Sequence, residues 1–234
     1  MQRLIHYSIS LFVIIFSINA AALDVGVGVK AGTTGVGVDI SFALTRTINA
    51  RLSLTSYDFD SRSETVEIDD ADNRATIDAD LAIDFGANAL LFDWYVFDGT
   101  FHLTTGIVQN NTEFDLTGQL SDATVVFDGT TYNVLNDFSD PTMSGTVKLS
   151  DSFEPYMGVG WGRKAGADSG FSLSFELGIM FISPEINLKA PTHVDPNLQA
   201  QLDEDVKEAE DAALDEISDF EIWPVVSLGL NYAF

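Results

Sequence analysis

The sequence predicts an all-β fold: an antiparallel, up-and-down transmembrane β-barrel of about eight strands with long loops on one side. Apolar residues alternate with small or polar residues along several segments of about ten residues, the length of a tilted membrane strand. The connections between these segments are short on one side and mostly long on the other. Beyond the N-terminus, no apolar run approaches the roughly 20 residues of a membrane-spanning helix.

The N-terminus reads as a secretory signal. Arg3 precedes the apolar run Ile9–Ile18, and Ala20–Ala22 supplies the small residues that a signal peptidase requires. We therefore expect residues 1–22 to be a signal peptide and residues 23–234 to form one barrel domain. A retained anchor helix is the alternative, which the shortness of the run and the cleavage-type residues disfavour.

Composition excludes several functions. The chain has 36 acidic against 11 basic residues and a formal charge of −25. So acidic a chain repels nucleic acid, which we do not expect as a partner. It has no cysteine, which excludes disulfides, thiolate chemistry, cysteine metal sites and an acylated N-terminal cysteine.

The last segment, Phe220–Phe234, shows the alternation most clearly. Every second residue from Phe234 back to Val226 is apolar, and the residues between them are small or polar. Such a strand has its two faces in different surroundings. The same pattern, weaker in some places, predicts strands near residues 24–30, 35–44, 48–59, 75–89, 101–110, 153–162 and 171–181.

The connections agree with a membrane barrel. If both chain ends lie on the periplasmic side, the long connections 61–74, 111–152 and 183–219 all fall on the outer side. Bacterial barrels have short periplasmic turns and longer outer loops. We therefore expect three long outer loops.

Alternation alone does not say which face points inward. In a soluble barrel or sandwich, the Val, Leu and Phe face would form the core. The opposite face here is rich in Gly, Ser and Ala, which suits the lumen of a narrow barrel better than a surface in water. We therefore assign the apolar face to lipid.

The C-terminal residues Leu228, Leu230, Tyr232 and Phe234 resemble the barrel-assembly signal of Gram-negative outer-membrane proteins. The segments 28–39, 44–52 and 155–162 look like those of poorly characterised proteobacterial barrels, of the small eight-stranded OmpA, OmpX or OmpW type. The resemblance implies the cell outer membrane as location, with the barrel-assembly machinery, lipid and lipopolysaccharide as partners. It implies no catalytic residues.

Charged side chains on the predicted lumen face form the main candidate site. Ions in a narrow interior need partners, because desolvating an unpaired charge costs several kcal/mol. We expect Lys30 and Arg51 to bind carboxylates of neighbouring strands and to plug the barrel, although an ion-conducting path is the alternative. The predicted charges are Asp24, Lys30, Asp39, Arg51, Asp78, Asp80, Asp84, Glu154 and Glu176.

Signals for catalysis are weak. Within the predicted mature chain, histidine occurs only as His102, at a predicted periplasmic end, and His193, in a loop without an obvious serine partner. The acidic loop 61–74 lacks the oxygen ligand and glycine of an EF-hand, so we expect a solvated loop and no metal. We expect no enzyme and no cofactor.

One segment, Asn197–Phe220, has the spacing of an amphipathic helix with an acidic face. We expect it to pack over the barrel mouth or the neighbouring long loop, and a partner-binding helix is the alternative. The expected function is a structural or adhesion-type surface role for a plugged, monomeric barrel. A narrow, porin-like conduit for small apolar solutes is the second possibility, and a lipid-modifying enzyme is the third.

Overall fold

The computed structural model describes residues 24–60, 64–69, 73–97, 99–127, 130–150, 152–162, 164–217 and 221–234. The predicted signal peptide, residues 1–22, lies outside them. The prediction of an all-β antiparallel fold is confirmed, because every strand pairing in the described chain is antiparallel.

One set of strands is joined by pairings that return to their starting point, and we call it the strand ring. In ring order it consists of β1 (Val25–Gly32), β2 (Gly35–Ala43), β3 (Ile48–Asp60), β5 (Asn73–Trp94), β6 (Phe101–Asn110), β11 (Phe153–Trp161), β12 (Gly170–Phe181) and β15 (Ile222–Ala233). β15 then pairs with β1, from Gly26 opposite Ala233 to Gly32 opposite Ser227.

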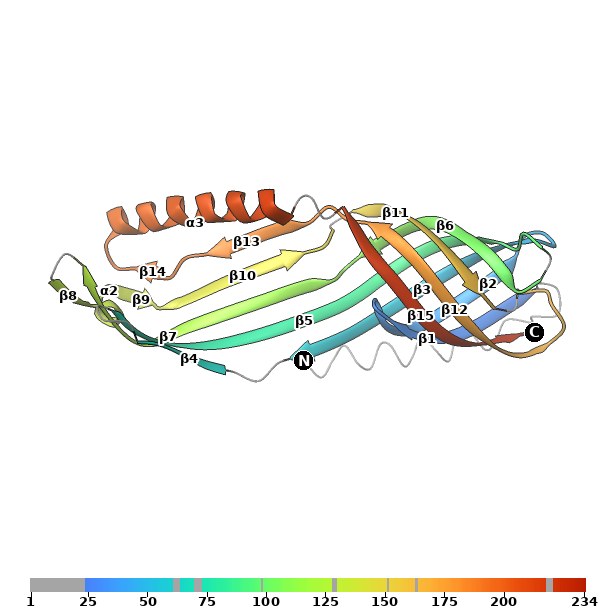
Figure 1. Ribbon diagram of the computed structural model, residues 1–234, viewed down its shortest axis with the longest axis horizontal. Coiled ribbons are helices and arrows are strands. Elements are labelled where there is room, and N and C mark those ends of the chain that lie inside the picture. Colours follow the sequence, from blue (N-terminus) through green and yellow to red (C-terminus); the bar gives the residue numbers. More distant parts are fainter. Residues whose placement is uncertain are drawn as a thin grey trace.

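The two ends of the ring differ. Asp24 and Phe234 lie at one end, which we call the terminal end, together with the short connections β2–β3, β5–β6 and β11–β12. At the other end, the extension end, β5 continues beyond its pairing with β6 into a second sheet region (Figure 1). The molecule is therefore elongated, with the extension projecting from one end of the ring.

The extension corrects the prediction of three long loops. The sheet that contains the ring has 13 strands, because segments expected to be loops pair with β5 and with one another. Period-two patterns in these segments are weak, so sequence alone did not separate them from loops. The added elements are β4 (Glu64–Asp69), β7 (Glu113–Phe127), β8 (Thr130–Asn133), α2 (Val134–Asp137), β9 (Phe138–Asp140), β10 (Thr142–Lys148), β13 (Glu185–Lys189) and β14 (Thr192–His193).

The expected acidic helix is present as α3 (Pro196–Ile217). It lies along the edge strand β13 and not over the ring (Figure 1). Glu210 of α3 accepts a hydrogen bond from the backbone N–H of Leu188, at 3.0 Å. Of the helices in the described chain, none is long and apolar enough to cross a bilayer.

Burial separates the two faces of the ring. The outward residues include Leu173, 79% exposed, and Leu228, 63% exposed, whereas Arg51 on the inward face is 7% exposed. In β5 the face assignment made from the sequence is wrong. The odd-numbered residues Leu91 and Asp93 are buried inside, and the even-numbered residues Phe92 and Trp94 are exposed.

Candidate functional site: an ion-pair layer inside the strand ring

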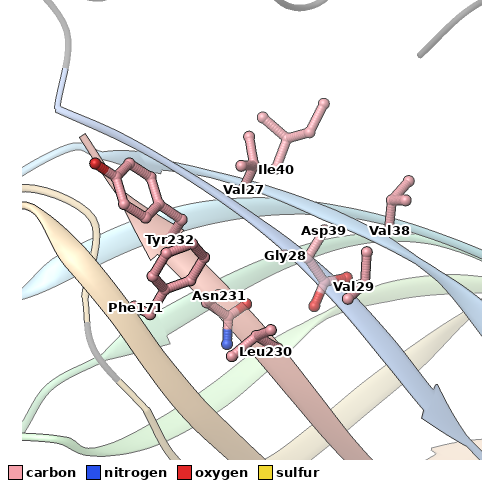
Figure 2. Close-up of a pocket in the computed structure, with 10 residues that line it drawn as sticks. All are labelled: Val27, Gly28, Val29, Val38, Asp39, Ile40, Phe171, Leu230, Asn231 and Tyr232. Carbon is pink, nitrogen blue, oxygen red and sulfur yellow. The ribbon is translucent and has the colours of Figure 1, made fainter.

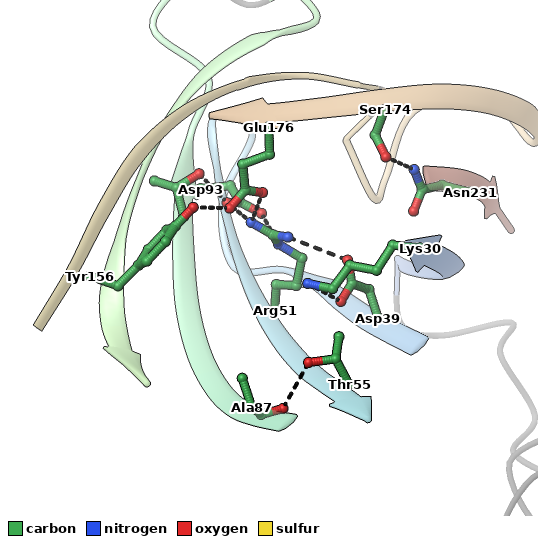
Figure 3. A network of polar contacts seen from close by, with 11 residues as sticks. Lys30, Asp39, Arg51, Thr55, Ala87, Asp93, Tyr156, Ser174, Glu176 and Asn231 are labelled. Atoms are coloured by element: carbon green, nitrogen blue, oxygen red, sulfur yellow. Dashed lines mark hydrogen bonds and ion pairs between the residues drawn. The ribbon is translucent and has the colours of Figure 1, made fainter. Parts of the chain in front are cut away.

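Arg51, on β3, lies at the centre of a buried ion-pair layer that crosses the ring interior (Figure 3). Its Nε lies 2.9 Å from Asp93 Oδ2, and its Nη2 donates to Asp93 Oδ1 at 3.0 Å, which makes the pair bidentate. Nη2 also reaches Glu176 Oε2 at 2.5 Å, and Nη1 reaches Asp39 Oδ2 at 3.3 Å. One guanidinium therefore links carboxylates from three other strands, a task for which its planar fork is suited.

Three further side chains join the layer. Lys30 Nζ lies 3.1 Å from Asp39 Oδ1, so this carboxylate is shared between two cations. The hydroxyl of Tyr156 donates to Glu176 Oε1, and the hydroxyl of Thr104 donates to Asp93 Oδ1 at 2.8 Å. Each carboxylate in the layer thus has at least two partners, as buried charges require.

Glycines on the inward face make room for the large side chains. A Cβ placed on Gly178 would lie 2.2 Å from Tyr156 Oη, and one placed on Gly160 would lie 2.4 Å from His102 Nε2. Inward residues recur at every second position of a strand. β12 can therefore place Gly178 next to the Tyr156 side chain, and β11 can place Gly160 next to the His102 side chain. The small residues that marked the inward face in the sequence are thus the counterparts of Tyr156 and His102.

An apolar layer lies next to the ion pairs, toward the extension end. Its buried side chains are Ala87, Leu91, Val108, Leu149, Tyr156, Met180, Ile182 and Val225, with Phe114 and Trp223 packed against them. Met180 has no exposed surface. From the terminal end toward the extension end, the interior therefore contains a layer of charged side chains and then a layer of apolar side chains.

Two small cavities lie inside the ring, lined by residues of the described chain. One cavity of about 30 Å³ lies beside Arg51, Asp93 and His102, and another of about 30 Å³ lies beside Leu91 and Met180. Lys30 and Glu176 line both cavities, so the ion-pair layer separates them. A space of this size holds about two or three water molecules, and it is far smaller than the roughly 150 Å³ of an apolar cavity that binds benzene.

The structure brings together four of the predicted charged residues: Lys30, Asp39, Arg51 and Glu176. Asp24 is exposed at the terminal end. Glu154 lies at the far end of the interior, where it accepts hydrogen bonds from Ser150, Ser152 and Ser183.

Asp84 is exposed, on the opposite face of β5 from the buried Leu91 and Asp93, so its predicted place in the lumen is wrong. Asp78 and Asp80 share its parity, and they lie where β5 pairs with β7, outside the ring. Desolvation, together with Asp58, Asp115 and Asp60, raises the pKa of Asp84.

Asp93 and Tyr156 belong to the layer but were missed from the sequence. Asp93 lies beyond residue 89, where the predicted strand ends, and the inverted face of β5 hid its parity with the inward residues. Tyr156 was missed because an aromatic residue on an inward face carries no charge signal. Its parity with Glu154, two residues earlier, was the available clue.

His102 and His193 are the two histidines of the described chain, and they lie in different surroundings. His102 is buried, with Nδ1 3.3 Å from the carbonyl oxygen of Thr100 and its ring against Tyr95. His193 Nδ1 accepts from the backbone N–H of Asp195, beside α3. Within the described residues, no group of three or more His, Asp or Glu side chains is placed to hold a metal ion.

The residues of the C-terminal signature lie on β15 or directly after it. Leu228, Leu230 and Phe234 are exposed on the outward face. The Tyr232 ring contacts Phe171 and Phe234, with centroid distances of 4.9 and 5.0 Å. These side chains are thus available to lipid or protein and do not enter the ion-pair layer.

Comparisons with known proteins extend to the fold only. No family model and no curated protein matches the sequence. Among solved structures, Acinetobacter baumannii CarO2 is similar, with a TM-score of 0.51 and 16% identity over 90% of this chain and 98% of that chain. Acinetobacter baumannii CarO gives a TM-score of 0.50 and 16% identity over 89% and 97%. The chain therefore shares the overall architecture of these two proteins.

Proposed function

We propose that this protein is a non-enzymatic, monomeric outer-membrane protein whose strand ring is a closed eight-stranded transmembrane barrel. In this proposal, the ion-pair layer and the apolar layer plug the lumen. The extension stands outside the cell, where it serves a structural or adhesion-type role. Lipid and lipopolysaccharide surround the protein, and the C-terminal signature is read by the assembly machinery.

The outward face of the ring supports a membrane location. Its exposed side chains are mostly Val, Leu, Ile, Phe and Trp, and a contiguous apolar surface of this kind is rare on soluble monomers. At the terminal end, Phe97, Phe101, Trp161 and Phe175 form a row of contacting rings. Aromatic rows of this kind mark the membrane–water interface of barrels.

The observation that carries the plugged lumen is the bidentate Arg51–Asp93 pair, with cavities of only about 30 Å³ on either side of the layer. An eight-stranded barrel is just wide enough for its own side chains to fill it. The same observation disfavours the narrow conduit for apolar solutes, since a solute would have to displace both layers.

Planar-bilayer recording tests the proposal. We expect purified protein to insert without steady conductance steps. A double variant, Arg51→Ala with Tyr156→Ala, removes the two largest side chains of the layer, and we expect it to conduct small ions. The matched control, Lys148→Ala, lies in the extension and should be silent. Steady steps from the unaltered protein would overturn the plugged lumen.

A further inference from the structure

The outer wall of the ring has an apolar groove at its terminal end (Figure 2). It has a volume of about 210 Å³ and crosses β12, β15, β1 and β2. The lining residues are Val27, Gly28, Val29, Val38, Asp39, Ile40, Phe171, Leu230, Asn231 and Tyr232.

The two polar residues of this lining do not offer their side chains to the groove. In Figure 2, the Asp39 carboxylate and the Asn231 amide point to the opposite side of the wall from Val38 and Ile40. Asp39 is held there by Lys30 and Arg51, and Asn231 donates to Ser174 Oγ at 2.7 Å. The groove therefore presents aliphatic and aromatic groups and no free charge.

The shape of the groove follows from the residues around it. Valines at positions 27, 29 and 38 are short, whereas the rings of Phe171 and Tyr232 rise at the terminal end and contact each other edge to face. Gly28 adds no side chain on either side of the wall. A low floor of small residues with an aromatic ridge at one end makes a channel, open at its surface, along the wall.

Its location identifies the occupant. The groove is bordered by exposed apolar residues of the same wall, among them Leu173 and Leu228. In the proposed membrane location, an occupant of the groove is therefore in contact with hydrocarbon and not with water. Tyr232 and Phe234 lie in contact at the terminal end of the groove, and aromatic residues are enriched at the membrane–water interface. Apolar spaces of about 150 Å³ already bind a small hydrocarbon, so about 210 Å³ accommodates a section of an alkyl chain.

We propose that this groove is a binding site for one acyl chain of a phospholipid in the periplasmic leaflet. The inference rests on the proposed membrane function. The headgroup lies beside Tyr232, and the chain runs along the valines toward the bilayer centre. The interaction is one of shape and dispersion, because no charged side chain faces the groove.

The test is retention of lipid by protein refolded into vesicles of phosphatidylethanolamine and phosphatidylglycerol, released into mild detergent and weighed by native mass spectrometry. We expect a species with one bound phospholipid. Val38→Phe fills the groove and should lower the retained fraction at least tenfold. Val226→Phe makes the same change on the outward face outside the groove and should leave retention unchanged.

Heat-modifiable gel mobility verifies that each variant folds, and Ile40→Phe replaces Val38→Phe if the latter does not. Equal retention by the groove variants and the unaltered protein overturns the site. So does a lipid-free dimer that Val38→Phe abolishes, because a second copy then occupies the groove. Protein that folds and floats with vesicles but retains no lipid overturns the groove alone. Protein that does not associate with vesicles overturns the membrane function as well.

Discussion

At the scale of single residues, Arg51 is the cation that holds the buried carboxylates of the interior together. Its guanidinium pairs with three carboxylates, so its removal leaves Asp93, Glu176 and Asp39 buried, with Lys30 as the remaining cation in contact with them among the described residues. Breaking a buried pair by removing one partner is far more costly than the pair's net contribution to stability. Substitution of Arg51 is therefore the most sensitive test of the layer.

We expect Arg51→Ala to lower the free energy of unfolding by about 3–5 kcal/mol. The measurement is a urea titration in detergent micelles, in which heat-modifiable gel mobility reports the folded fraction at each urea concentration. Lys148→Ala is the control, because its ion pair with Glu113 is long, at 3.9 Å, and partly exposed. That variant should change stability by less than about 1 kcal/mol. Equal effects of the two variants would show that the interior pairs are solvated.

Gly178→Ala tests the close approach of Tyr156. The new methyl group would lie 2.2 Å from the Tyr156 hydroxyl oxygen, so the tyrosine must move away from Glu176. Overpacking of this kind costs about 1–3 kcal/mol. In a Tyr156→Ala background the same change should cost almost nothing. A double-mutant cycle of unfolding free energies without coupling would contradict this contact.

At the scale of elements, alternation predicted most of the ring strands but not their continuation. The assignment of β1, β2, β12 and β15 depended on clean apolar and small alternation, and these strands are present. In β5, both faces carry apolar residues, since Ala87 and Leu91 face the apolar layer while Leu90 and Phe92 face outward. The part of β5 that lines the ring therefore has no period-two signal of its own, so the assignment came from the alternation before residue 86, which gave the wrong inward face and hid Asp93.

Prediction of the site from the sequence was limited in the same way. Lys30, Asp39 and Glu176 lie on strands of clear parity, and Arg51 lies on a strand whose pattern is weaker. The sequence nevertheless predicts all four on the inward face. Which carboxylate pairs with which cation depends on the register between strands. Register arises from pairings across the whole chain and is not visible in local sequence.

Helix α3 protects an edge. β13 would otherwise present unpaired N–H and C=O groups, which template pairing with another chain. Deleting residues 197–218 should leave the heat-modifiable mobility of the ring unchanged, because α3 contacts β13 and β14. Amide exchange in β13 and β10 should accelerate, as measured by mass spectrometry. Loss of heat modifiability would instead place α3 in the support of the ring.

Asp84 gives the extension a pH response. Its pKa is raised by desolvation and by Asp58, Asp115 and Asp60, so its charge opposes folding above that pKa. The penalty is relieved as the pH falls through the raised pKa. We expect Asp84→Asn to raise the melting temperature at pH 7 and to have no effect below its ordinary pKa of 3.8.

Glu204→Gln, on the exposed surface of α3, removes one charge away from this group and is the control. An equal gain from Glu204→Gln would show that Asp84→Asn acts only through net charge.

At the scale of the whole molecule, the two ends of the ring predict its orientation. The absence of cysteine allows single cysteines to be introduced and labelled on intact cells. We expect Glu204→Cys in α3 to react with a membrane-impermeant maleimide. Ala167→Cys, in the connection at the terminal end, should react only after the cells are broken. The opposite labelling pattern would reverse the proposed orientation.

The pairing of β1 with β15 has a consequence for the order of assembly. Gly26 lies opposite Ala233, so β1 gains its second neighbour only when β15 is in place. Until then the ring has two unpaired margins, and the entropy of closing a loop of about 200 residues opposes the last pairing. The ring therefore cannot close from its N-terminal strands alone, and every intermediate that lacks β15 exposes unpaired backbone groups on β1.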